Sequence, residues 1–174
     1  MANALSLLRL LLVAPFAWLL ARGDATSAPW AVALFWIAVA SDLADGPLAR
    51  ARGTASAFGR ALDHAADFAF VDAGLFAAAA RGALPWLLPV LVAAAFAQYV
   101  ADSYWLERAG QLRMSRLGRW NGVLYFVPVG ALALADLGVP LLGSAVRPFA
   151  WALCATTLAS IADRALSLRR VESA

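Results

Sequence analysis

Four aspartates lie in or beside two strongly apolar stretches of this 174-residue chain. Asp42 and Asp45 are three residues apart and Asp63 and Asp67 are four apart, so each pair projects from one face of a helix. An aspartate at the centre of a membrane span costs about 2.5 to 3.5 kcal/mol, so a group of them needs compensating charge. Hard divalent cations such as Mg²⁺ are held by carboxylates together with substrate phosphates. The spacing therefore predicts a metal site shared by two neighbouring helices, with chemistry on a phosphate-bearing substrate.

The residues between these acids are either small or suited to phosphate. Gly46, Ala49 and Gly59 leave open volume beside the carboxylates, and small residues also let membrane helices approach closely. Arg50 offers a fork-shaped pair of donors that matches phosphate oxygens. Together they predict a pocket with room for a flat base and a diphosphate.

The composition places the helices that carry these residues in lipid. Hydrophobic residues make up 63% of the chain, charged residues 14%, and the mean hydropathy is +0.74. A soluble domain of this length cannot bury that much apolar surface. A membrane-crossing helix needs about 20 mostly apolar residues. We expect residues 1–174 to form a single all-α integral membrane domain of six transmembrane helices. The predicted spans are residues 4–21, 29–50, 58–80, 84–106, 117–137 and 145–168.

The basic residues are all arginines, and their distribution predicts the orientation of the chain. Positively charged loops stay on the cytoplasmic side of a membrane. With the N- and C-termini cytoplasmic, eleven of the 14 arginines fall on that side, and Arg22, Arg81 and Arg147 fall outside. The prediction is a multi-pass protein of the inner membrane whose active site faces the cytoplasm. A net charge of +3 without a basic, polar, aromatic-bearing segment favours lipid headgroups or phosphates over nucleic acid as partners.

The acidic stretch resembles the signature of a known family. It reads D-x2-D-G-x2-A-R-x8-G-x3-D-x3-D from Asp42 to Asp67, and every fixed position matches the CDP-alcohol phosphatidyltransferases. The N-terminal residues Asn3 to Ser6, followed by Arg9 and Pro15, are also similar to the opening helix of that family. The resemblance implies a six-helix membrane enzyme, usually a homodimer, with its active site at the cytoplasmic face.

The resemblance also implies roles for the matched residues. Asp42, Asp45 and Asp63 would hold one or two Mg²⁺ or Mn²⁺ ions, and Asp67 would contact the metal site and act as general base. The CDP part of the donor would be framed by Gly46, Ala49, Arg50 and Gly59, with a further contact from Ser56. The implied reaction is the transfer of a phosphatidyl group from CDP-diacylglycerol to a small alcohol, with release of CMP, in phospholipid biosynthesis.

Alternatives stay open at this point. The donor is either CDP-diacylglycerol or a CDP-linked headgroup, with diacylglycerol as acceptor in the second case. A different class of function is a membrane transporter or a non-catalytic scaffold that keeps the signature. The first 22 residues have some features of a secretory signal, but Arg9 interrupts the apolar run and no basic region precedes it. We interpret this stretch as the first span.

Several polar residues outside the signature have two interpretations. The basic loop residues Arg108, Arg113, Arg116 and Arg119 either set the topology or bind an anionic acceptor. His64 follows Asp63 and is expected on a different helix face from the ligands, so we interpret it as a bystander. The identity of the acceptor alcohol stays open.

Overall fold

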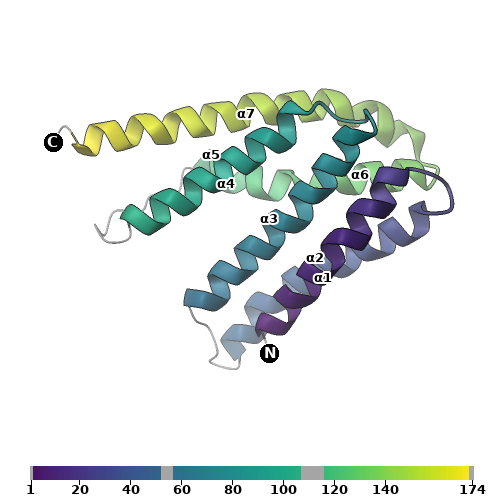
Figure 1. The fold of residues 1–174 in the computed structure, drawn as a ribbon, viewed down its shortest axis with the longest axis horizontal. Coiled ribbons are helices and arrows are strands. Elements are labelled where there is room, and N and C mark those ends of the chain that lie inside the picture. Colours follow the sequence, from purple (N-terminus) through teal and green to yellow (C-terminus); the bar gives the residue numbers. More distant parts are fainter. Residues whose placement is uncertain (1, 52–56, 107–115, 173–174) are drawn as a thin grey trace.

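The computed structural model describes residues 2–51, 57–106 and 116–172, and every regular element in these ranges is a helix (Figure 1). Apolar runs of this length form helices in lipid because a helix satisfies all of its backbone polar groups internally. The helices are α1 (Ala2–Arg22), α2 (Ala28–Ala51), α3 (Ala57–Ala80), α4 (Leu87–Leu106), α5 (Arg116–Leu124), α6 (Phe126–Asp136) and α7 (Pro140–Glu172).

The fifth predicted span is a broken helix. Residues 117–137 form α5 and α6, which meet at Tyr125. Pro128 explains the break, since it has no N–H to donate and its ring crowds the carbonyl of Leu124, four residues earlier. The backbone N–H of Tyr125 still donates to the carbonyl of Asn121 at 2.9 Å, so the two pieces follow one path. Counted together, α5 and α6 leave six helical units, as the hydropathy pattern predicts.

The helices pack as two groups that spread apart toward one end of the molecule (Figure 1). Helix α1 lies against α2 and α3, whereas α7 lies against α4, α5 and α6. Helix α3 contacts members of both groups. The short connections after α1, α3 and α6 gather at one end, and the first residues of α1 and α3 lie toward the other (Figure 1). Successive helices therefore alternate in direction.

At the closed end, where the connections after α1, α3 and α6 lie, an aromatic pair joins α1 to α3, and two glycines bring α6 close to α2 and α3. Phe16 of α1 stacks on Phe70 of α3 with ring centroids 4.5 Å apart. A Cβ at Gly74 would lie 2.8 Å from Val129, and one at Gly130 would lie 2.6 Å from the ring of Phe35. Both glycines thus allow α6 to approach its neighbours more closely than any side chain would permit.

The short connections at the closed end carry their own polar contacts. Arg81, which follows α3, pairs with Asp136 at the end of α6 across 2.8 Å. Between α1 and α2, Asp24 accepts hydrogen bonds from the backbone N–H groups of Thr26 and Ser27. Hydrogen bonds from the side chain of Thr26, and then from Arg22, hold the pKa of Asp24 well below its usual range. Asp24 therefore stays ionised and fixes the turn that enters α2.

Two of the described helices are long and apolar enough by themselves to cross a bilayer, at Ala4–Arg22 and Leu141–Leu166. Ala28–Ala44 and Leu87–Asp102 are shorter apolar helices. On α3, Asp63, Asp67 and Asp72 interrupt the apolar length of the helix. The observed fold is all-helical, with these two stretches as candidate membrane spans.

Candidate active site

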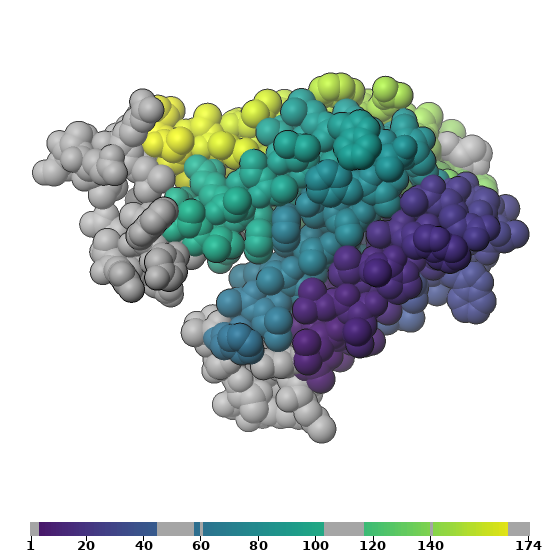
Figure 2. Space-filling model, viewed as in Figure 1, coloured from purple at the N-terminus to yellow at the C-terminus, as the bar shows by residue number. Residues whose placement is uncertain are grey.

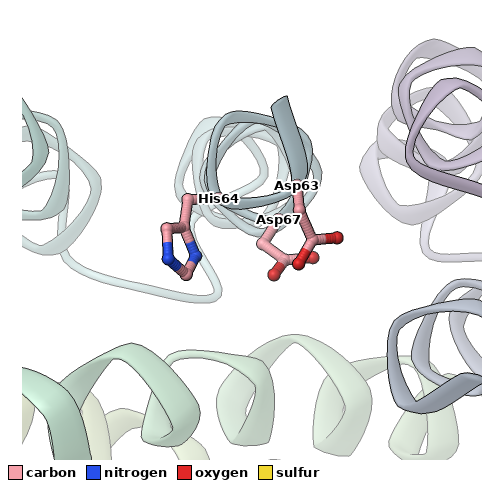
Figure 3. Close-up of side chains that lie close together, drawn as sticks. All are labelled: Asp63, His64 and Asp67. Carbon is pink, nitrogen blue, oxygen red and sulfur yellow. The ribbon is translucent and has the colours of Figure 1, made fainter. Parts of the chain in front are cut away.

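Two carboxylates and one imidazole converge on the first half of α3. Asp63, His64 and Asp67 each offer a potential ligand atom, and these atoms all lie within 4.8 Å of one another. Figure 3 shows the two carboxylates side by side, with the imidazole beside them. The i, i+4 spacing brings Asp63 and Asp67 together because it returns to the same helix face. His64 lies closer to this pair than its place in the sequence led us to expect.

A buried arginine from α1 joins this pair to α2. Arg9 is fully buried, and its Nη1 donates to Oδ1 of Asp63 at 3.2 Å and also to Oδ1 of Asp67. Its Nη2 lies 3.4 Å from Oδ1 of Asp42. Ser6, one turn earlier on α1, donates to Asp63 at 3.4 Å. The three aspartates therefore surround a single guanidinium.

Sequence reasoning did not anticipate these contacts of Arg9. Its partners on α3 are 54 and 58 residues away along the chain, so no local spacing reveals them. One signal was present: Arg9 is a lone charge inside an apolar span, and such a charge needs a buried partner. The acids on α2 and α3 were the obvious candidates.

The remaining residues of the signature differ in how far the structure describes them. Gly59 lies in the first turn of α3, one turn before Asp63. Asp45, Gly46, Ala49 and Arg50 belong to the last turns of α2, and their side chains lie outside the described part of the chain. Ser56 lies outside the described residues altogether, as do Arg108 and Arg113, and the side chain of Arg116 is likewise not described.

A cavity of about 840 Å³ opens beside the carboxylates, between the two groups of helices. Figure 2 shows the surface hollowed where α3 and α4 separate. Asp42 and Asp67 line its polar part, whereas most of its wall is apolar and includes Phe68, Phe96 and Phe126. Such a space can hold a polar headgroup next to the acids while apolar chains lie along the rest of the wall.

Two arginines, from α5 and α7, form a charged wall of the cavity. Arg164 of α7 donates to Asp102 of α4, and its guanidinium lies 5.5 Å from the ring centroid of Tyr99. His64 meets the same ring edge-on, with centroids 6.2 Å apart. Arg119 of α5 also lines the cavity. Anionic groups on a ligand in this cavity would therefore find arginine donors on this wall.

Comparison with known proteins decides the family. The family model described as CDP-alcohol phosphatidyltransferase matches residues 1–163. This chain belongs to the CDP-alcohol phosphatidyltransferase family. It is therefore a membrane transferase of phospholipid biosynthesis, and the resemblance seen in the signature is confirmed.

Two named enzymes are similar to this phosphatidyltransferase. A probable phosphatidylglycerophosphate synthase of Mycobacterium tuberculosis, found in strains H37Rv and CDC 1551, is 31% identical over 98% of this chain and 83% of its own. A cardiolipin synthase (CMP-forming) of Streptomyces coelicolor is 40% identical over 52% of this chain and 44% of its own. No solved structure matches the chain with statistical significance.

The donor set of this phosphatidyltransferase fits the divalent metals that its family uses. Carboxylate oxygens are the ligands that hard divalent cations prefer, and Asp63 and Asp67 bring theirs together on one helix. Asp42, Asp63 and Asp67 also surround a cation already, the guanidinium of Arg9. All three side chains keep some exposure, from 23% to 37%, so a metal and a phosphate can still reach them.

Proposed function

We propose that this enzyme transfers a phosphatidyl group from CDP-diacylglycerol to a glycerol-type alcohol that carries a phosphate, releasing CMP. The observation that carries the proposal is the carboxylate cluster at the mouth of a largely apolar cavity. A CDP-linked lipid has a highly charged diphosphate next to two acyl chains, and this cavity offers a matching polar and apolar part. The proposed setting is the inner membrane, with six spans, both termini in the cytoplasm and the site at the cytoplasmic face.

Each residue of the signature has a proposed task. Asp42, Asp45, Asp63 and Asp67 hold Mg²⁺ or Mn²⁺, with two ions as the proposed number. Bound metal supplies charge neutralisation on the diphosphate as the CMP leaving group forms. The CDP part is bound along the α2–α3 side by residues whose proposed contacts follow the family signature. These are Gly46, Ala49, Arg50, Ser56 and Gly59.

The proposed transfer breaks the phosphoanhydride bond of the donor and forms a phosphate ester bond to the acceptor. The acceptor hydroxyl oxygen attacks the phosphorus that carries the diacylglycerol, and a new P–O bond forms there. The bond from that phosphorus to the bridging oxygen of the diphosphate breaks, so CMP leaves with the electron pair. The hydroxyl proton goes to a carboxylate oxygen of Asp67, which lines the cavity where the acceptor would enter.

The acceptor class rests on the relatives and on the charged wall of the cavity. The names of both relatives describe products built from glycerol phosphates. In this chain, Arg119 and Arg164 line the cavity that the acids share, and guanidinium groups bind phosphate oxygens with good geometry. A phosphate on the acceptor would therefore bind on the arginine side and present its hydroxyl toward Asp67. Of the loop arginines, Arg119 is the one that the described structure supports for this task.

An acceptor panel tests the proposal directly. Purified enzyme in lipid nanodiscs receives CDP-diacylglycerol labelled in its acyl chains, Mg²⁺ or Mn²⁺, and one acceptor at a time: glycerol 3-phosphate, phosphatidylglycerol, inositol phosphate or serine. We expect labelled lipid product and stoichiometric CMP with a glycerol-phosphate acceptor. In the alternative case, the label stays in CDP-diacylglycerol, and a CDP-linked headgroup reacts with diacylglycerol instead. That result would make the CDP-linked headgroup the donor. Turnover of no CDP-linked donor would favour a transporter or scaffold.

A homodimer is the proposed oligomeric state, following the family resemblance. Native mass spectrometry of the enzyme released from nanodiscs gives the number of chains directly. A mass of twice 18.3 kDa is the expected result. A monomer that retains full transfer activity would overturn this part of the proposal and leave the chemistry untouched.

A further inference from the structure

Arg9 is a fully buried cation inside the carboxylate cluster, and the transfer reaction as proposed gives it no task. A guanidinium cannot lose its proton in a protein, so its positive charge is permanent. It therefore repels any metal ion that the same carboxylates bind.

The contacts of Arg9 show what this charge does in the protein. Nη1 bridges Asp63 and Asp67, while Nη2 lies near Asp42 on another helix. Without a cation, three carboxylates at one point would repel each other strongly, because Coulomb energies between unit charges reach several kcal/mol at such distances in a protein. Arg9 lowers the charge of these three acids from −3 to −2, which a single divalent ion neutralises.

We propose that Arg9 is a built-in counter-cation that sets the affinity of the metal site and positions Asp63 and Asp67. This inference rests on the proposed metal-binding function. When metal is absent, Arg9 holds helices α1, α2 and α3 together at the end where the carboxylates of α2 and α3 lie. Its charge also weakens metal binding, so the ions are held loosely enough to enter and leave with phosphate-bearing ligands. Arg9 is a positioning residue, because it acts through the carboxylates.

The direction in which metal affinity changes distinguishes a counter-cation from a purely structural residue. If Arg9 serves only as a structural link, its loss disturbs the cluster and weakens metal binding. If it is a counter-cation, its loss removes repulsion and strengthens metal binding, although the metal-free protein becomes less stable. Metal affinity and metal-free stability then move in opposite directions.

The test compares Arg9→Gln with the wild-type enzyme in nanodiscs, without substrate. Mn²⁺ affinity is measured by electron paramagnetic resonance, and melting temperature is measured with EDTA and with saturating Mn²⁺. We expect Mn²⁺ to bind at least about tenfold more tightly to Arg9→Gln, since a unit charge within a few ångströms of the ion is removed. The melting temperature in EDTA should fall, and the rise on adding Mn²⁺ should exceed that of wild type.

Arg81→Gln is the matched control. Arg81 is also a poorly exposed arginine in an ion pair, with Asp136, but it lies at the opposite end of α3 from the acids. Its loss should lower the melting temperature equally in EDTA and in Mn²⁺ and leave Mn²⁺ affinity unchanged. This variant shows what removing a structural ion pair does by itself.

Arg9→Lys keeps the test decisive if Arg9→Gln does not fold. The ammonium retains the charge but loses the planar fork that bridges two carboxylates. We expect Mn²⁺ affinity within about threefold of wild type and a transfer rate lowered about tenfold or more, a loss of the size that 1.4 kcal/mol produces. A tenfold change of Mn²⁺ affinity in this variant would contradict a role for charge.

The outcomes also distinguish this inference from the proposed function. Weaker or unchanged Mn²⁺ binding in Arg9→Gln, with normal binding in wild type, would overturn the counter-cation and leave the metal site standing. Wild-type enzyme that binds no Mn²⁺ would instead remove the proposed metal chemistry on which the inference rests.

Discussion

Asp67 has the most demanding task in the proposed mechanism, in which it would contact the metal site and receive the proton of the acceptor. Replacement by Asn removes both the negative charge and the basic oxygen while preserving shape. We expect Asp67→Asn to lower the rate of CMP release by at least about 100-fold, the lower range for loss of a general base. The measurement is labelled CMP released from CDP-diacylglycerol in nanodiscs.

Asp72 provides the control for that substitution. It is a buried aspartate on the same helix, five residues after Asp67, and is absent from the cavity lining and from the acid cluster. Asp72→Asn should retain near wild-type turnover. Comparable losses in the two variants would mean that any buried charge on α3 matters and that Asp67 has no special role.

Arg119 is the residue that we expect to govern acceptor affinity. Arg119→Gln should raise the KM for glycerol 3-phosphate about tenfold, because a charge-assisted hydrogen bond to phosphate contributes roughly 1.5 to 3 kcal/mol. The KM for CDP-diacylglycerol should change little. Arg147→Gln is the control, since Arg147 is exposed on α7 and does not line the cavity. An increase in donor KM alone would move Arg119 to the nucleotide side of the site.

At the residue scale, the sequence anticipated the acids better than their partners. Asp63 and Asp67 are related by helical periodicity, which is local and can be read directly from spacing. The contacts of Arg9 depend instead on how α1 packs against α3, which no spacing rule encodes. The pair of Arg164 and Asp102 joins residues 62 positions apart, so no local spacing indicates it.

At the scale of helices, hydropathy located the elements but not their interruptions. The predicted spans agree with α1 to α4 within a few residues, because long apolar runs leave few alternatives in lipid. The break at Tyr125 was missed, although Pro128 in the fifth span was its visible signal. The extent of α7, from Pro140 to Glu172, exceeds the predicted 145–168 at both ends, and at its C-terminal end polar residues extend the helix past the apolar run that hydropathy detects.

Gly130 controls how closely α6 approaches α2. A Cβ at this position would lie 2.6 Å from the buried ring of Phe35, so that ring or the helix must move. Overpacking of this kind costs about 1 to 3 kcal/mol, which outweighs the gain of up to about 1 kcal/mol in helix propensity from Ala. We expect Gly130→Ala to lower the melting temperature of the enzyme in nanodiscs.

Gly143→Ala separates the clash from the change in propensity. Gly143 is also within a helix, but a Cβ there would lie at an ordinary 3.5 Å from Ala135. This variant should melt at the wild-type temperature or slightly above it. If both alanine variants stabilised the protein equally, the close approach of α6 and α2 would not limit its stability.

At the scale of the whole molecule, the positions of the arginines and the alternating direction of the helices together predict the orientation of the chain in the membrane. Successive helices reverse direction in Figure 1, and the turn between α1 and α2 lies at the end away from the acids. The positive-inside rule places most arginines, and therefore the acidic end, in the cytoplasm. The turn between α1 and α2 should then face the outside.

Cysteine labelling tests that orientation. The buried Cys154 is first replaced by Ala, and a single cysteine is placed either at exposed Ala25 in this turn or after Ala174. In right-side-out vesicles, we expect a membrane-impermeant maleimide to label Ala25→Cys and to spare the C-terminal cysteine. Inverted vesicles should give the opposite pattern. Labelling of both positions from the same side would require an even number of spans between them, with the helix that fails to cross found by moving the cysteine turn by turn. The reversed pattern at both positions would place the acidic end outside and contradict the proposed orientation.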